Sequence, residues 1–194
     1  MNNVRAKVVE AVLREAARAH EQAARDSVGS VLAVADVMTA AFDGGGKVLI
    51  FGNGGSAADA QHFACELAGR FLRERRALPA LALTTDTSAI TAIANDYGFD
   101  RIFVRQIEAL GRPGDVAVGI STSGSSGNVL AGLRFAKAHG LKTVAFTGGD
   151  GGLVGAEADV HVNVPLALTP RVQELHRTLI HAVCDLIESG LSDA

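Results

Sequence analysis

The sequence has no tryptophan, one tyrosine and two cysteines in 194 residues. So few aromatic rings weaken any case for a surface that stacks on unpaired bases. Cys65 and Cys184 stand far apart and outside any CxxC spacing, which argues against both a disulfide framework and a structural zinc knuckle. Reduced thiols are typical of the cytoplasm, and we expect a cytoplasmic protein.

The chain also lacks a large charge imbalance and a long apolar run. Its formal net charge of -3 argues against nucleic acid or an anionic membrane as a partner. Charges interrupt the N-terminal stretch MNNVRAKVVEAVLREAARAHEQ every few residues, so we expect neither a signal peptide nor a membrane span there. One basic cluster is present. It consists of Arg70, Arg73, Arg75 and Arg76. We expect this cluster to be solvated or to face another subunit, and the alternative is a contact with a phosphate or a partner.

The chain is rich in apolar residues. With 48% hydrophobic residues, it can form one globular domain with a substantial core, and we expect a single domain over residues 1–194. Apolar positions at helical spacing over residues 1–41, with a break near 26–29, predict two N-terminal helices. Their faces are rich in Ala and Val, and we expect them to contribute to an oligomer surface.

Beyond Gly44 the pattern alternates between short apolar strands and helices. The predicted strands are 47–51, 79–84, 115–120, 142–147 and 159–164, and the predicted helices are 56–69, 87–95, 101–110, 127–139 and 170–189. This order predicts an α/β fold with a doubly wound, mostly parallel sheet flanked by helices. Ligands of such sheets bind outside the carboxyl ends of the strands, so the loops after residues 51, 84 and 120 are the places to look.

The first of these loops contains Asn53, Gly54 and Gly55. Glycines allow close backbone approach, so amide groups at the start of the next helix could face an anion or a sugar hydroxyl. Ser56 reads as the cap of that helix. The same letters, GNGGSA, also fit a dinucleotide-binding fingerprint, with Asp86 as the ribose-binding acid, and this alternative stays open.

The third loop is rich in hydroxyl groups and lies between a buried strand and an amphipathic helix. Its predicted ligand-binding members are Ser121, Thr122, Ser123 and Ser126. Hydroxyls and backbone amides at a helix N-terminus form a phosphate cradle that needs no lysine. The sequence therefore predicts a phosphomonoester held as a handle while chemistry happens elsewhere.

Candidate reactive groups lie on two helices. His62 and Glu66 share a face of the helix after the first loop, and Gln173 and His181 lie two turns apart on the last helix. If the helices meet, these four residues could hold a zinc-like divalent ion or place a general base beside a general acid. The spacing does not distinguish the metal site from the acid/base pair. The apolar residues around His181 favour a third interpretation, a histidine buried in the core.

Four segments resemble the phosphoheptose isomerases of the SIS domain family: GNGGSAADAQHFACEL, LALTTDTSAITAIANDYGF, GISTSGSSGNVL and TPRVQELHRTLIHAVCDLIE. The resemblance covers essentially the whole chain and implies a flavodoxin-like SIS fold. It also implies a homotetramer and an aldose-ketose isomerase that converts sedoheptulose 7-phosphate to D-glycero-D-manno-heptose 7-phosphate through an enediol. This would be the first step of heptose synthesis for lipopolysaccharide or another surface polysaccharide.

The resemblance further implies a role for each site residue. Glu66 and His181 would be the acid/base pair. A zinc ion would be held by His62, Glu66, Gln173 and His181, so two roles compete for one carboxylate. The substrate-binding residues it implies are Asn53, Gly54, Gly55, Glu66, Asn95, Asp96, Ser121, Thr122, Ser123, Ser126 and Gln173.

One position departs from some members of that family, and one alternative belongs to another functional class. Where those members have an Asp just before the Arg of the last helix, this chain has Pro170. A non-catalytic SIS protein that binds the replication initiator DnaA, or a regulatory sugar phosphate, is the alternative. That protein lacks the Glu and the last-helix His, and this chain retains both as Glu66 and His181.

Overall fold

The computed structural model describes residues 2–192. Its helices are α1 (Asn2–Asp26), α2 (Val28–Asp43), α3 (Gly55–Ala68), α4 (Thr87–Tyr97), α5 (Ile102–Leu110), α6 (Gly127–Ala138), α7 (Gly152–Glu157) and α8 (Thr169–Ser192), with a 3-10 turn, η1 (Phe99–Arg101). Its strands are β1 (Val48–Gly52), β2 (Ala80–Ala82), β3 (Val116–Ser121), β4 (Lys142–Gly148) and β5 (Val160–Val164).

The five strands form one sheet in the order β2-β1-β3-β4-β5, and every neighbouring pair is parallel. The prediction of a doubly wound parallel sheet is confirmed. Because β1 lies between β2 and β3 and all three are parallel, the loops that follow them meet at the carboxyl-terminal end of the sheet. The order reverses at β1, so this end is where such folds bind ligands.

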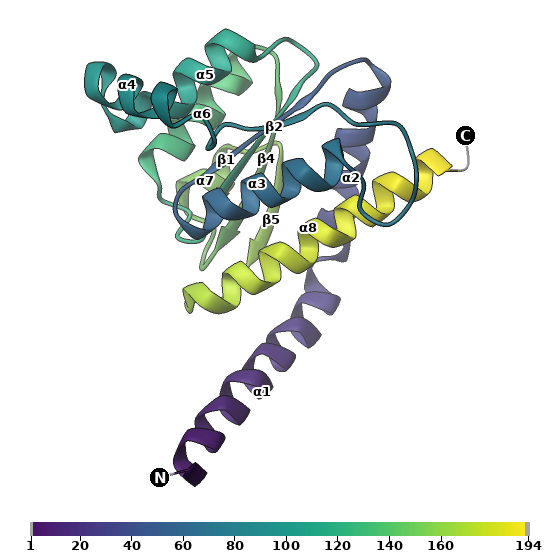
Figure 1. Cartoon of the computed structure of the whole chain (residues 1–194), viewed down its shortest axis with the longest axis vertical. Coiled ribbons are helices and arrows are strands. Elements are labelled where there is room, and N and C mark those ends of the chain that lie inside the picture. The colour runs from purple at the N-terminus through teal and green to yellow at the C-terminus, as the bar shows by residue number, and fades with distance from the viewer. Residues whose placement is uncertain (1, 193–194) are drawn as a thin grey trace.

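Helices cover both faces of the sheet, which explains why the strands are almost continuously apolar. Val48 and Ile50 of β1 point into a core shared with α2, α3 and α8. Leu49 and Phe51, which alternate with them, point into a second core shared with α5, α6 and α7. Figure 1 shows the result: α3 and α8 run side by side on one face, and α4 to α6 lie on the other.

The two predicted N-terminal helices are present, and the chain between them breaks at Ser27. Figure 1 shows α1 extending away from the sheet as a long arm. Apolar side chains on α1 are solvent-exposed, with Val4 69% and Leu13 64% accessible. A helix with an uncovered apolar stripe needs a partner to bury it.

The structure differs from the predicted elements in three places. Strand β2 has three residues where six were expected, because it lies at the sheet edge and pairs with β1 alone. The short helix α7 was not predicted. Ser56 is not a cap: α3 begins one residue earlier, and its cap position is Gly54, whose positive φ of 54° makes the turn.

None of the helices within residues 2–192 combines the length and the hydropathy that a membrane crossing requires.

Candidate functional site

Helices α3 and α8 pack in parallel, and matched residues face each other along the seam. Gly55 lies against the side chain of Gln173 at the amino-terminal end. One turn further, Arg177 Nη2 donates to Asp59 Oδ1. A turn beyond that, His62 meets His181. The packing therefore brings together functional side chains that are more than 100 residues apart in the sequence.

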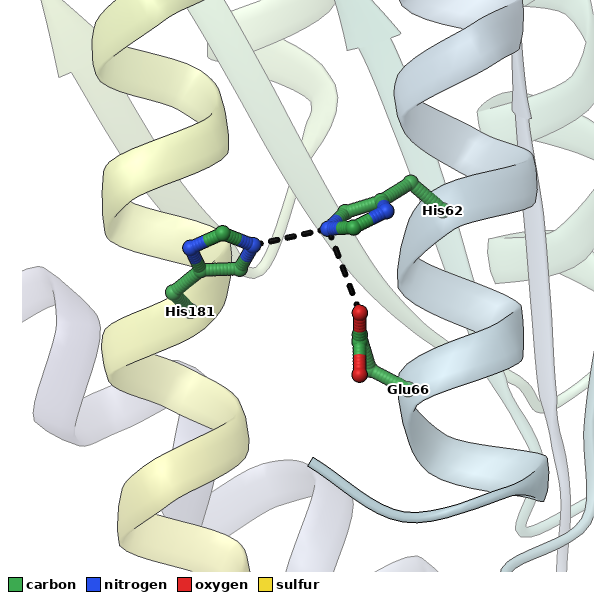
Figure 2. A group of neighbouring side chains, drawn as sticks. All are labelled: His62, Glu66 and His181. Atoms are coloured by element: carbon green, nitrogen blue, oxygen red, sulfur yellow. Dashed lines mark hydrogen bonds and ion pairs between the residues drawn. The ribbon is translucent and has the colours of Figure 1, made fainter. Parts of the chain in front are cut away.

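The centre of the seam is a cluster of His62, Glu66 and His181, drawn in Figure 2. The two Nε2 atoms of the histidines are 2.7 Å apart, and His62 Nε2 lies 3.4 Å from Glu66 Oε1. A hydrogen bond at this distance requires one Nε2 to donate and the other to accept, so the two rings would have to be in different tautomers. All three side chains are partly accessible, so a ligand can reach them.

The surroundings of His181 favour its neutral form. Burial lowers the pKa of His181 most, and His62 and Arg177 lower it further, while Glu66 acts in the opposite direction. The ring lies between two other rings, with centroids 5.0 Å from His62 and 5.1 Å from Phe71. A neutral imidazole held in this way can accept or relay a proton near neutral pH.

The same cluster has the donor chemistry of a metal site. Two imidazole nitrogens and one carboxylate oxygen lie within 4.8 Å of one another. These are ligands that zinc takes in catalytic sites, where three protein donors leave a position open. The residues therefore fit a divalent ion, and three of the four predicted metal ligands are brought together.

Gln173, the fourth predicted ligand, lies elsewhere. It precedes His181 by eight residues, about 12 Å along the helix. Its amide packs so closely on Gly55 that a Cβ there would lie 2.2 Å from Nε2. It lines a hollow of about 360 Å³ with Asp59 and Arg177. The Oδ2 atom of Asp59 is buried and has no hydrogen-bond partner within residues 2–192, so the ion pair of its Oδ1 with Arg177 is the contact that holds this carboxylate on the seam.

The first loop is joined to the third by a reciprocal pair of amides. Asn53 Nδ2 donates to Asn128 Oδ1 at 2.8 Å, and Asn128 Nδ2 returns a hydrogen bond to Asn53 Oδ1 at 2.9 Å. Asn128 is buried and was missed by the sequence prediction. The available signal was its position directly after Gly127, at the start of α6. The pair sets the spacing between the two loops.

In the third loop the serine hydroxyls converge. Ser121 Oγ lies 2.9 Å from Ser126 Oγ and 3.5 Å from Ser123 Oγ. The loop is anchored from behind, because Val154 N donates to the carbonyl of Gly124 at 2.9 Å. The carbonyl of Thr122 packs on Gly148, where a Cβ would lie 2.4 Å away. A set of hydroxyls at the amino-terminal end of α6 is suited to an anion.

The middle loop and α4 hold the remaining predicted residues. Asp86 caps α4 by accepting from Ala89 N at 2.9 Å, so the acid that a dinucleotide site would need is engaged in the helix start. Asn95 and Asp96 are exposed near the end of α4, where Asn95 Nδ2 donates to Asp96 Oδ1 at 2.8 Å. They lie outside the His-Glu cluster. The chain just after them returns to the third loop, because the carboxylate of Asp100 lies against Gly127.

The basic cluster is engaged within the chain. Arg70 Nε lies 3.1 Å from Glu74 Oε1, and Arg73 pairs with Asp185. Arg75, whose side chain is 3% exposed, lies 3.1 Å from Glu188 Oε1. These ion pairs account for three of the four arginines.

Sequence and structure comparisons show which known proteins this chain is similar to. The family model described as "SIS domain" matches residues 12–148. Phosphoheptose isomerase of Geobacter metallireducens is 55% identical over 179 residues, covering 92% of this chain and 95% of the relative. That of Aquifex aeolicus is 58% identical over 158 residues, covering 81% and 83%.

Among solved structures, phosphoheptose isomerase GmhA from Neisseria gonorrhoeae superimposes with a TM-score of 0.90 at 49% identity, covering 94% of this chain and 98% of its own. A phosphoheptose isomerase from Francisella tularensis gives a TM-score of 0.92 at 36% identity, covering 95% and 98%. The fold and the site therefore define a protein of the SIS domain family. Within that family, the chain belongs to the phosphoheptose isomerases.

Proposed function

We propose that this protein is an aldose-ketose isomerase that converts sedoheptulose 7-phosphate to D-glycero-D-manno-heptose 7-phosphate, the first step of heptose synthesis for a surface polysaccharide. The observation that carries the proposal is the meeting of His62, Glu66 and His181 on the seam between α3 and α8. Isomerisation of a sugar requires proton transfers between adjacent carbons, and a carboxylate beside a neutral imidazole supplies a base and an acid for them.

The reaction needs two balanced pairs of proton transfers. In the first, a base removes a proton from C1 while an acid delivers one to the carbonyl oxygen on C2, which gives a cis-enediol. In the second, a proton is delivered to C2 and one is removed from the oxygen on C1, which gives the aldehyde. We assign these transfers to Glu66 and His181.

The loops would hold the rest of the substrate. Ser121, Ser123 and Ser126 would bind the phosphate, with backbone groups of Thr122 beside them. His62 lies seven residues from Gly55 along α3, about 10 Å from the start of that helix. The proposed substrate would extend from the serine loop past the first loop to the cluster. The residues proposed to contact it along the way are Asn53, Gly54, Gly55, Asn95, Asp96 and Gln173.

We also propose that the cluster binds Zn²⁺. His62, Glu66 and His181 would hold it, and Gln173 stays a proposed fourth ligand that would have to turn from Gly55 toward His62. When bound, such an ion supplies Lewis-acid polarisation of the sugar carbonyl. The carboxylate of Glu66 would then serve as a ligand and as a proton carrier.

The proposed assembly is a homotetramer of single SIS domains spanning residues 1–194, with the helices of residues 1–41 at its interfaces. The exposed apolar side chains of α1 support it, because a second copy could bury them. We place the protein in the cytoplasm, in keeping with the free thiols of Cys65 and Cys184.

The test is incubation of the purified chain with sedoheptulose 7-phosphate, with and without added Zn²⁺, while the aldose product is measured. We expect conversion. Absence of turnover under both conditions, in protein shown to be folded, overturns the enzyme. Stable complex formation with the initiator DnaA in that case would favour the non-catalytic alternative.

A further inference from the structure

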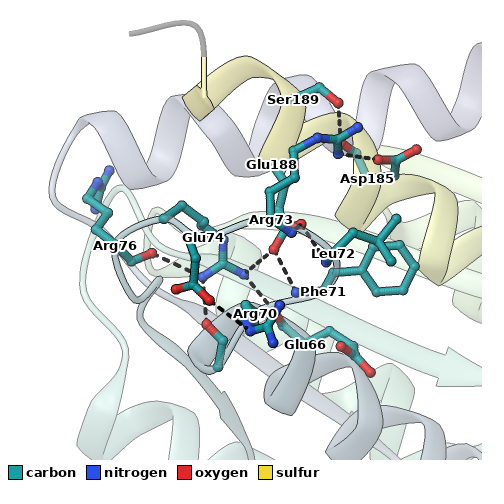
Figure 3. Close-up of polar contacts among 12 residues, drawn as sticks. Glu66, Arg70, Phe71, Leu72, Arg73, Glu74, Arg76, Asp185, Glu188 and Ser189 are labelled. Carbon is teal, nitrogen blue, oxygen red and sulfur yellow. Dashed lines mark hydrogen bonds and ion pairs between the residues drawn. The ribbon is translucent and has the colours of Figure 1, made fainter.

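The segment between α3 and β2, residues 69–79, is fastened to α8 by one buried carboxylate. Glu188 is 1% exposed, and its oxygens accept hydrogen bonds from the backbone N–H groups of Phe71, Leu72 and Arg73 at 2.6, 2.8 and 2.9 Å. Figure 3 shows Glu188 pointing from α8 into this backbone turn. Burial by itself raises the pKa of Glu188, but these N–H groups and Arg75 outweigh it and hold the pKa below its usual range.

Arg75 extends the attachment to the other helix of the site. Its guanidinium lies 3.1 Å from Glu188 and also donates to the main-chain carbonyls of Glu66, at 2.7 Å, and Gly69, at 2.9 Å. The carbonyl of Glu66 belongs to the last turn of α3, where a cation is favourable. Glu188 and Arg75 therefore join α8 to the turn of α3 that carries Glu66.

The same turn delivers an aromatic ring to the reactive cluster. Phe71, the first residue held by Glu188, packs on His181 with the ring centroids 5.1 Å apart and the planes tilted by 35°. His62 contacts the same imidazole ring. Glu188 and His181 are seven residues apart on α8, two turns along the same face. The imidazole of His181 is thus in contact with the ring of Phe71. The backbone of Phe71 is in turn held by Glu188, which lies on the same helix as His181.

We propose that Glu188 is a positioning residue for the isomerase site: by holding the backbone of residues 71–73, it keeps Phe71 packed on His181 and fixes the ring relative to Glu66. This inference rests on the proposed function and adds a residue that touches neither the sugar nor the cluster. A misplacement of about 1 Å in a reacting group can lower a rate by about 100-fold, so a remote carboxylate can matter to catalysis.

The experiment compares four variants of the full chain. Glu188→Gln weakens the attachment, Phe71→Leu removes the ring but leaves the attachment, and Phe71→Tyr keeps the ring. Asp115→Asn is the matched control, because Asp115 is a buried carboxylate that accepts from Lys47 N and Arg112 N and pairs with Lys47. It lies just before β3, at the amino-terminal ends of the strands and so at the opposite end of the sheet from the binding loops. Each variant is assayed for kcat, KM and thermal unfolding. The ring-current shift of His181 is followed by NMR of histidine-labelled protein.

We expect Glu188→Gln and Phe71→Leu to lower kcat at least about 10-fold with little change in KM, because Phe71 packs on a reacting group and not on the phosphate cradle. Phe71→Tyr should keep kcat, and Asp115→Asn should lose stability without losing kcat. The His181 shift should change in the first two variants alone. If Glu188→Gln does not fold, Phe71→Leu and Phe71→Tyr decide.

An unchanged His181 shift and kcat in Phe71→Leu would overturn the proposal, as would a loss of kcat in Asp115→Asn equal to that in Glu188→Gln. The NMR readout needs no turnover. Its result is therefore separate from failure of the proposed function, which would appear as an inactive wild type.

Discussion

His62 and His181 bring their Nε2 atoms within 2.7 Å of each other, although 119 residues separate them in the chain. The contact exists because α3 and α8 run in parallel and place matched turns opposite each other. Glu66, one turn along α3 from His62, completes a set that can move protons and can bind a cation.

Replacement of either proposed acid/base residue should remove activity but not the fold. We expect Glu66→Gln and His181→Gln each to lower the rate with sedoheptulose 7-phosphate at least about 100-fold, the lower range for a general acid or base. Glu108→Gln, at an exposed site on α5, is the control for the carboxylate change. Circular dichroism would check the fold. A variant with near-normal turnover would remove its residue from the mechanism.

Metal content should depend on the cluster. Protein purified without chelators or a metal-affinity tag should carry a divalent metal, and His62→Ala should lower the amount bound per chain, because one of three clustered donors is lost. Elemental analysis measures this directly. The control is His139→Ala, since His139 is an exposed residue that contacts Phe135 on α6. Equal metal in wild type and His62→Ala would place any ion elsewhere.

Most of the fold was predictable because its signals are local. A strand such as Val48–Gly52 is buried along its whole length and bounded by glycines, so its apolar run is visible in sequence. β2 was predicted too long because an edge strand has one neighbour, and Leu81, 42% exposed, is apolar without being buried. The helix Gly152–Glu157 was missed because two glycines in six residues hide its helical pattern.

The site was predictable only in part. The i,i+4 spacing of His62 and Glu66 is local and placed both on one face of a helix. Their meeting with His181 depends on helix packing, which no local pattern records, and the family resemblance supplied it. The same limit hid Glu188 and Arg75: a carboxylate and a guanidinium in sequence indicate an exposed surface, and their burial follows from the path of residues 69–79.

The serine loop should control substrate binding more than chemistry. We expect Ser126→Ala to raise KM about 10-fold and to leave kcat nearly unchanged, since a hydrogen bond to a charged group contributes about 1.5–3 kcal/mol. Ser30→Ala is the control, because Ser30 Oγ donates to the carbonyl of Ser27, just before α2, and lies away from the loop. Steady-state kinetics would decide. A fall in kcat with KM unchanged would contradict the phosphate role of Ser126.

Gly55 and Gln173 should be energetically coupled. A Cβ at Gly55 would lie 2.2 Å from Gln173 Nε2, so Gly55→Ala must displace that amide. In a Gln173→Ala background the obstacle is gone, and the helical preference for Ala over Gly should appear as a gain of less than about 1 kcal/mol, the value for a helix interior, because Gly55 is the first residue of α3. Urea unfolding of the two single variants and the double variant measures the coupling. Simple additivity would show that the two side chains do not meet.

His176 should make the protein less stable in mild acid. It is fully buried, and its Nε2 donates to the carbonyl of Thr147 at 3.0 Å. Burial lowers the pKa of His176 most, while the Thr147 carbonyl and Asp59 act in the opposite direction. The imidazole of His176 therefore takes up a proton near pH 6.5 in the unfolded chain, but only at a lower pH in the folded chain. The contribution of His176 to stability is retained above pH 6.5 and lost as the pH falls below it.

Replacing the imidazole isolates this contribution from that of the other histidines. His176→Leu should flatten the dependence of the unfolding free energy on pH between about 6.5 and 5, by up to about 1.4 kcal/mol per pH unit, the limit for one proton. The slope is informative even if the variant is less stable at every pH, because loss of the bond to Thr147 shifts the whole curve. Urea unfolding at a series of pH values gives both slopes. Parallel curves for wild type and variant would mean that the buried ring takes up a proton as readily as in the unfolded chain.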